Sequence, residues 1–101
     1  MALTTVARLR LEGKGFHTLF EQNQPRWTQM AQRAHALIAP YVPGGQPTID
    51  DVRKILLPMV ELDDVLRAFR MNHQPKALIQ NFWVSDFTDY ILYRVLPLVH
   101  D

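Results

Sequence analysis

The sequence contains no cysteine among its 101 residues. The chain therefore has no disulfide, no thiolate metal ligand and no cysteine nucleophile, and it suits a reducing compartment. Ser85 is the one serine, and no arrangement of serine, histidine and acid stands out as a nucleophilic triad. We therefore expect a cytoplasmic protein that is not an enzyme.

Long apolar runs are also missing. No stretch approaches the roughly 18 consecutive apolar residues of a membrane-spanning helix, and residues 1–10 contain arginines where a signal peptide has its apolar core. We expect no membrane partner. The composition, 48% hydrophobic and 21% charged, is typical of a folded globular protein. The length suits a single helical domain over residues 1–101, with an internal loop at residues 43–47.

The four histidines, His17, His35, His73 and His100, are widely spaced. Metal-binding histidines on a helix or a short loop usually lie about four residues apart, and no pair here does. Gly13-Lys14-Gly15 lacks the preceding strand and the Gly-Lys-Ser/Thr sequence of a phosphate-binding loop, so we interpret it as a flexible joint. We predict no metal and no cofactor.

The net charge is only +1, but the charges are unevenly distributed. Residues 1–47 carry five basic and two acidic side chains, whereas residues 48–101 carry six basic and eight acidic ones. A nucleic-acid surface usually shows a denser basic stripe than this. A nucleic-acid-binding regulator is our alternative function. Its candidate contacts are basic residues of the first half, whose helical phases do not form one stripe: Arg8, Arg10, Lys14, Arg26 and Arg33.

The N-terminal segment supports two interpretations that lead to different fold classes. A helical stripe with spacings of three and four residues runs through Val6, Leu9, Gly13, Phe16 and Phe20. Residues 8–11 instead alternate like a strand, and residues 12–15 could form the turn of a hairpin. We favour the helix because its stripe spans the whole segment. The alternative is an α+β fold with an N-terminal hairpin at residues 5–20.

Residues 24–47 predict one amphipathic helix followed by a loop. Pro25 suits the first helical turn. The apolar side chains then fall on a narrow arc: Trp27, Met30, Ala31, Ala34, Leu37, Ile38 and Tyr41. Two prolines and two glycines within residues 43–47 end the helix, because they cannot sustain its hydrogen bonds.

Residues 48–71 predict two short helices. Thr48 and Asp51 form a variant of the capping box, which marks the start of the first helix. Pro58 lacks the N–H that would bond to Lys54, so we expect the helix to bend or restart there. The second helix has a buried stripe consisting of Leu62, Val65, Leu66 and Phe69.

The last twenty residues hold five of the ten aromatic residues. Residues 76–84 predict a short helix, Ser85 is a good N-cap for the final helix, and we expect Pro97 to distort its last turn. The apolar side chains of this helix point all round its axis, so it is either central in its own bundle or part of an interface. We predict an all-α, single-domain bundle of five or six short helices.

Arg94 directly follows Tyr93 on this final helix and lies about one turn after Tyr90. Arginine flanked by tyrosines is a composition common at protein-binding hot spots. Alternatively, its stem lies along apolar surface while the guanidinium reaches water or an acid. We hypothesise a non-catalytic protein-interaction module of regulatory, inhibitory or immunity type, which binds a protein partner or a second copy of itself as a dimer. The predicted contacts are Trp83, Tyr90, Tyr93 and Arg94.

A third hypothesis comes from two arginine and histidine spacings. Arg67 precedes His73, and Arg94 precedes His100. Both resemble the loose arginine-then-histidine pattern of the helical HEPN ribonucleases. The resemblance implies an arginine that stabilises phosphate charge and a histidine that moves a proton. Because so loose a pattern arises by chance in a chain rich in arginine, we rank this hypothesis below the other two.

Overall fold

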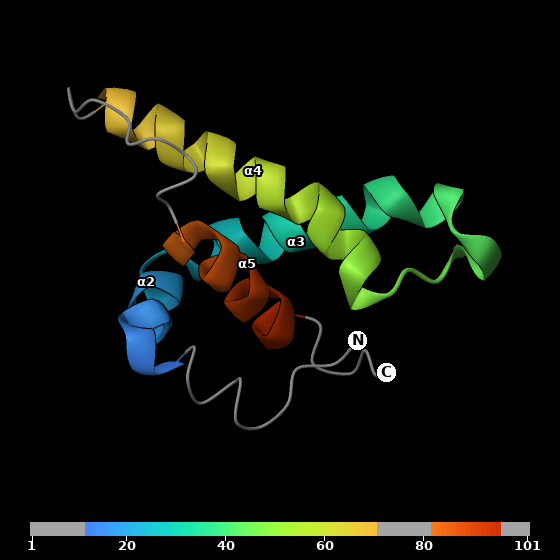
Figure 1. Ribbon diagram of the computed structural model, residues 1–101, viewed down its shortest axis with the longest axis horizontal. Helices are drawn as coiled ribbons and strands as arrows, with labels where there is room; N and C mark the ends of the chain where they lie inside the picture. Colours follow the sequence, from blue (N-terminus) through green and yellow to red (C-terminus); the bar gives the residue numbers. More distant parts are fainter. Residues whose placement is uncertain (1–11, 71–81, 96–101) are drawn as a thin grey trace.

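The chain is all-α over the residues that the computed structural model describes, 12–70 and 82–95 (Figure 1). This part holds four α-helices and no strand: α2 (His17–Gln22), α3 (Gln24–Ile38), α4 (Ile49–Arg70) and α5 (Phe82–Val95). Shorter turns of other helix types form η1 (Glu12–Phe16), η2 (Ala39–Tyr41) and η3 (Pro43–Gly45). The all-α prediction is confirmed. The predicted number of five or six helices is wrong for this part of the chain, because two predicted boundaries are absent.

The described part of the N-terminal segment is helical. η1 and α2 extend from residue 12 to residue 22, with an interruption at Gly15. Its φ of 80° lies in the left-handed region that glycine adopts without strain. Phe16 and Phe20 of the predicted helical stripe are both buried. Residues 12–20 therefore do not form part of a hairpin, and the α+β alternative is wrong over that range; residues 1–11 lie outside the described part.

α3 begins where Pro25 predicted it, with the proline in the first helical turn. Trp27, Ala31 and Ala34 form its buried face. Leu37 and Tyr41, which the sequence placed on the same arc, are 54% and 84% exposed. The apolar arc of this helix is therefore wider than the core that covers it.

A capping box starts α4, as predicted from Thr48 and Asp51. The Thr48 N–H donates to Oδ2 of Asp51 at 2.9 Å, and the Asp51 N–H donates to the Thr48 hydroxyl at 3.2 Å. Each side chain thus satisfies a backbone donor that the first helical turn leaves without a partner. The hydrogen bond from the Thr48 N–H is the main reason why the pKa of Asp51 is lowered.

α4 is one continuous helix of 22 residues, so the predicted break at Pro58 is wrong. A proline inside a helix removes one backbone hydrogen bond and costs about 3 kcal/mol. Pro58 and Lys54, whose carbonyl loses that bond, are both exposed, so water can hydrate the carbonyl. On the opposite side of the helix, buried residues flank the proline in sequence: Val52, Leu56 and Val60. Their packing against the core keeps the helix continuous.

α5 also continues through a predicted boundary. It begins at Phe82 and passes through Ser85, which is therefore not an N-cap. The Ser85 hydroxyl instead accepts a hydrogen bond from Nη2 of Arg53 at 2.5 Å, and Nε of Arg53 donates to Oδ1 of Asp89 at 2.6 Å. These contacts fasten α5 to α4. Residues 76–81 and Pro97 lie outside the described part.

α5 is the central helix of the bundle. α3, α4 and η1 all pack against it (Figure 1). Among residues 83–95 no side chain is exposed. The buried ones come from several sides of the helix: Val84, Phe87, Thr88, Tyr90, Ile91 and Leu92. Of the two positions that the sequence left open, the central one accounts for the apolar pattern of this helix.

Candidate protein-binding groove

Tyr90 was predicted to bind a partner, but it is a core residue. Its side chain is 0% exposed. Its ring lies edge-on to the rings of Phe16 and Phe20, at centroid distances of 6.0 and 5.9 Å. A fully buried ring contributes to the stability of the domain and leaves no surface for a partner. The position of Tyr90 therefore does not support its predicted role.

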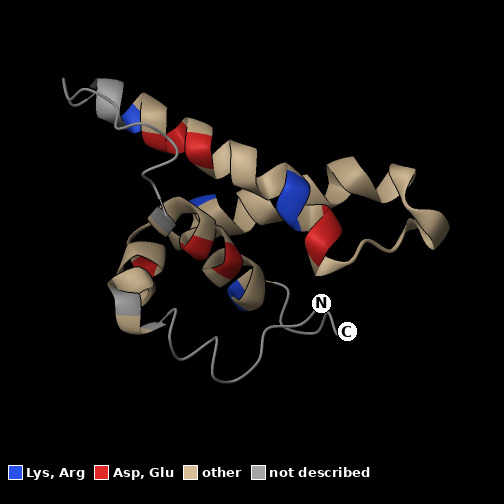
Figure 2. Cartoon of the chain, viewed as in Figure 1, with Lys and Arg blue, Asp and Glu red and all other residues tan. Residues whose placement is uncertain are grey.

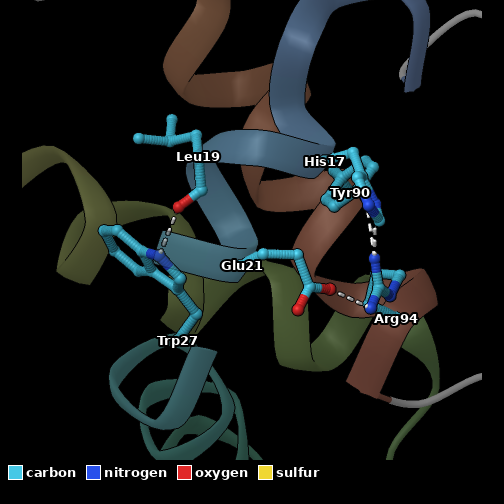
Figure 3. Close-up of polar contacts among 6 residues, drawn as sticks. All are labelled: His17, Leu19, Glu21, Trp27, Tyr90 and Arg94. Carbon is cyan, nitrogen blue, oxygen red and sulfur yellow. Dashed lines mark hydrogen bonds and ion pairs between the residues drawn. The ribbon is translucent and has the colours of Figure 1, made fainter. Parts of the chain in front are cut away.

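Arg94 joins α5 to α2 (Figure 3). Its Nη1 donates to the Tyr90 hydroxyl at 2.9 Å, and its Nη2 donates to Oε1 of Glu21 at 2.5 Å. The guanidinium carbon lies 4.7 Å from the centre of the Phe20 ring, a cation–π contact. Burial alone would lower the pKa of Arg94, but the hydrogen bonds to Glu21 and Tyr90 raise it, so the group stays charged. Arg94 thus follows the alternative prediction, in which the guanidinium reaches an acid.

Trp83 and Tyr93, the other two predicted contacts, are half-buried. The Trp83 ring lies 6.2 Å from the Phe87 ring, and the Tyr93 ring lies edge-on to Tyr90 at 5.0 Å. Both rings pack on the core and leave only part of their area to solvent. The four residues predicted on α5 therefore do not form a broad exposed patch.

The basic residues of the nucleic-acid alternative are only partly described. Arg26 forms an ion pair with Asp63, whose carboxylate is buried, whereas Arg33 is exposed. Figure 2 shows acidic and basic segments alternating along α4. The described helices thus lack the dense basic stripe that phosphate binding favours. Outside the described part lie Arg8, Arg10 and the side chain of Lys14.

Both arginines of the ribonuclease hypothesis have acidic partners. Arg94 pairs with Glu21, and Arg67 lies 3.5 Å from Asp64. Arg94 also lies near a histidine from the other end of the chain, with 3.2 Å between Nη1 and Nδ1 of His17. His73 and His100 lie outside the described part, so this hypothesis stays a prediction.

A groove of about 350 Å³ lies between α3 and α4. Its walls are mostly apolar and are completed by a few polar side chains. The apolar members are Met30, Met59, Leu62 and Leu66, and the polar ones are Arg26, Gln29, Arg33 and Asp63. A second hollow of about 380 Å³ shares Arg26 and Asp63 with it and reaches Trp27 and Arg67. The two hollows thus adjoin at Arg26 and Asp63, and the second extends to Leu19 and Gln22 of α2.

α4 forms one wall of the groove with a straight apolar stripe. Met59, Leu62 and Leu66 line the groove, and Ile55 precedes them by one turn; the four are spaced four, three and four residues apart, which places them within about 60° of one another around the helix. Leu62 and Leu66 are 58% and 49% exposed. This stripe lies beside the buried stripe of the same helix. α4 therefore has more apolar surface than the bundle covers.

α3 forms the other wall with the same spacing. Arg26, Met30 and Arg33 line the groove at spacings of four and three residues, and Leu37 lies on the same helix face one turn beyond them. Methionine side chains such as those of Met30 and Met59 are flexible and polarizable, which suits a surface that must fit an incoming side chain. The two helices thus present matching stripes to the same groove.

The arginines along the groove are paired unequally. Arg26 donates to Oδ1 of Asp63, and Nη2 of Arg67 lies 3.9 Å from Oδ2 of the same aspartate. The two cations therefore share one buried carboxylate. Arg33 is exposed, and it makes no ion pair with any residue whose side chain the structure describes. Arg33 therefore leaves a positive charge at the edge of an apolar groove.

The sequence contained a signal for this site that the predicted break at Pro58 concealed. We placed Leu62 and Leu66 in the buried stripe of a separate short helix and Leu37 on a buried arc. Taken as one helix, residues 49–70 carry two apolar stripes side by side, whereas a helix with one core-facing side needs only one. The second apolar stripe is therefore the sequence signal for an apolar surface outside the core.

Two helix faces with apolar side chains and a charged edge form the kind of surface that receives an amphipathic helix. Residues 12–70 and 82–95 contain no group of three or more histidine, cysteine, aspartate or glutamate side chains that could hold a metal ion. None of the helices in those ranges has the length and apolar character needed to cross a membrane. No protein-family model, curated protein or solved structure matches this chain.

Proposed function

We propose that this protein is a non-catalytic helical module that binds another protein through the groove between α3 and α4. The observation that carries the proposal is the open apolar stripe of α4, where Leu62 and Leu66 are 58% and 49% exposed. Single exposed leucines are common on protein surfaces. A contiguous apolar hollow rimmed by charge is typical of an interaction site.

The proposal keeps the class of function predicted from the sequence and moves the binding surface. The predicted surface on α5 has no exposed side chain among residues 83–95, and Arg94 is engaged within the domain. The groove has both the exposed apolar side chains and an unpaired cation within the described ranges. A regulatory, inhibitory or immunity-type role is compatible with a small binding module, and this part of the proposal rests on size and class.

Site-specific photo-cross-linking tests the proposal. Leu62 is replaced by a photoreactive phenylalanine derivative in the full chain, and the cells that produce it are irradiated. The matched control is Gln32, which is exposed and points away from the groove by its helical phase on α3. We expect a covalent adduct with another protein at position 62 and none at position 32.

Three outcomes would count against the proposal. Adducts of equal yield at both positions would show contact without a specific site. If no adduct formed at position 62 or at position 32, the groove would have no partner. An adduct with nucleic acid would favour the alternative regulator, whose binding should weaken steeply as the salt concentration rises.

A further inference from the structure

We propose that the occupant of the groove is one amphipathic helix of a partner protein, with an acidic side chain beside its apolar stripe. This inference rests on the proposed function and names the chemistry of the partner. It follows from three features of the described residues: the shape of the two walls, the pairing of the arginines, and the consequence of bringing two copies together.

The walls of the groove match a helix in length and spacing. Met59 and Leu66, the first and last groove-lining residues of α4, lie seven residues apart, and at about 1.5 Å per residue this wall spans roughly 10 Å, or two helical turns. An incoming helix with apolar residues at intervals of three and four would place successive anchors along this wall. A partner strand would need an open sheet edge, and residues 12–70 and 82–95 contain no strand. A helix therefore suits the groove better than an extended segment.

Arg33 selects the charge of the partner. Arg26 pairs with Asp63, and Arg67 lies close to both Asp63 and Asp64, so two carboxylates compensate these two positive charges within the domain. The guanidinium of Arg33 has no such partner in the described ranges, and it lines the groove together with Met30 and Leu62. A carboxylate placed next to the apolar stripe of the incoming helix would pair with it. A lysine at that position would be repelled.

The same charge disfavours a second copy of this chain as the occupant. A two-fold dimer brings the same surface of each protomer together. Packing two grooves face to face would place two Arg33 side chains at one interface, and the one acidic residue that lines the groove, Asp63, is already paired with Arg26 and Arg67. Like charges opposed across an interface reduce affinity and discriminate against that pairing. We therefore assign the groove to a different protein.

Two designed peptides test the charge preference directly. Both contain about 18 residues, enough for partial helicity, and both carry leucines spaced four, three and four residues apart. They differ only in the residues that flank the leucines, glutamate in one and lysine in the other. Binding to the full chain is measured by fluorescence anisotropy at low and moderate salt. We expect the glutamate peptide to bind about fivefold more tightly at low salt, with a smaller ratio at moderate salt.

Three variants assign the preference to the groove. Arg33→Glu should reverse the preference, so that the lysine peptide binds more tightly than the glutamate peptide. Lys54→Glu makes the same change of charge at an exposed position of α4 that does not line the groove, and it should leave the preference unchanged. Leu62→Asp should weaken the binding of both peptides about tenfold or more, because it places a charge in the apolar wall. Far-ultraviolet circular dichroism verifies that each variant keeps its helicity.

The outcomes separate this inference from the proposed function. If both peptides bind equally and Leu62→Asp weakens both, the acidic partner is refuted while a protein-binding groove remains supported. If neither peptide binds although cross-linking captures a protein at position 62, the inference fails alone. If the wild type is a dimer in sedimentation equilibrium and Leu62→Asp is a monomer, the occupant is a second copy and the inference is overturned. Failure of the cross-linking experiment refutes the proposed function itself.

Discussion

Replacing Leu56 and, separately, Leu62 with alanine tests whether the groove-lining face of α4 is exposed. Both leucines lie within the same helix, and both substitutions delete the same atoms, so the change in helix propensity is the same. Leu56 is 0% exposed and Leu62 is 58% exposed. A difference between the two free energies of unfolding therefore reports the packing of each side chain.

The expected magnitudes differ about threefold or more. Leucine-to-alanine substitutions at buried positions cost about 2.7–5 kcal/mol, because apolar contacts are lost and a cavity remains. We expect about 3 kcal/mol for Leu56→Ala. Leu62 buries less than half of its surface and its removal leaves no closed cavity, so we expect less than about 1 kcal/mol for Leu62→Ala.

Urea unfolding monitored by circular dichroism measures both losses by linear extrapolation. Thermal unfolding provides a second readout, since 1 kcal/mol shifts Tm by about 4–8 °C in a domain of this size. Equal losses for the two substitutions would refute the reasoning. Such a result would mean that Leu62 is as well packed as Leu56 and that the groove is not open to a partner.

Four further substitutions test the contacts between and within the helices. Glu21→Gln should lower the free energy of unfolding by about 0.5–1 kcal/mol at low salt, because it removes the charge that pairs with Arg94; an unchanged urea midpoint would contradict this. Thr48→Ala should cost about 1 kcal/mol by removing the N-cap of α4. The Thr48 N–H lowers the pKa of Asp51, so the stabilisation by Asp51 is present above the ordinary carboxyl pKa, near pH 4, and is lost as the pH falls through the lowered pKa. Asp51→Asn should reduce this acid-induced loss, and an identical pH profile would argue against the capping box. The pKa of Asp89 is shifted in the opposite direction, because burial raises it more than Arg53 lowers it. Its contribution to the free energy of unfolding is therefore present at low pH and is lost as the pH rises through the raised pKa. Asp89→Asn should remove that loss, which urea titrations between about pH 3 and pH 7 would detect.

The starts of α3 and α4 could be predicted because their signals act over a few residues. Pro25 suits a first helical turn wherever that turn lies in the fold, and the contacts of Thr48 with Asp51 join positions only three apart. The buried faces were also predictable in part, since the spacing of apolar residues determines which of them share a side of a helix. The all-α class follows from these local patterns.

Two local rules failed because contacts from other helices outweighed them. Pro58 does not end α4, because Leu56 and Val60 are held in the core on either side of it. Ser85 lies inside α5, and its hydroxyl accepts a hydrogen bond from Arg53 on α4 rather than capping a helix start. Neither contact can be recognised before the helices are placed against one another.

The candidate site depended on that placement most of all. Leu56 and Leu62 are the same residue type on neighbouring apolar stripes of one helix, yet one is covered by the core and the other lines an open groove. Arg94 pairs with Glu21, which lies 73 positions away in the chain. Local spacing specifies which side chains share a face, because helical geometry repeats over a few residues. Whether that face is covered depends on where distant segments pack, and this is a property of the assembled bundle.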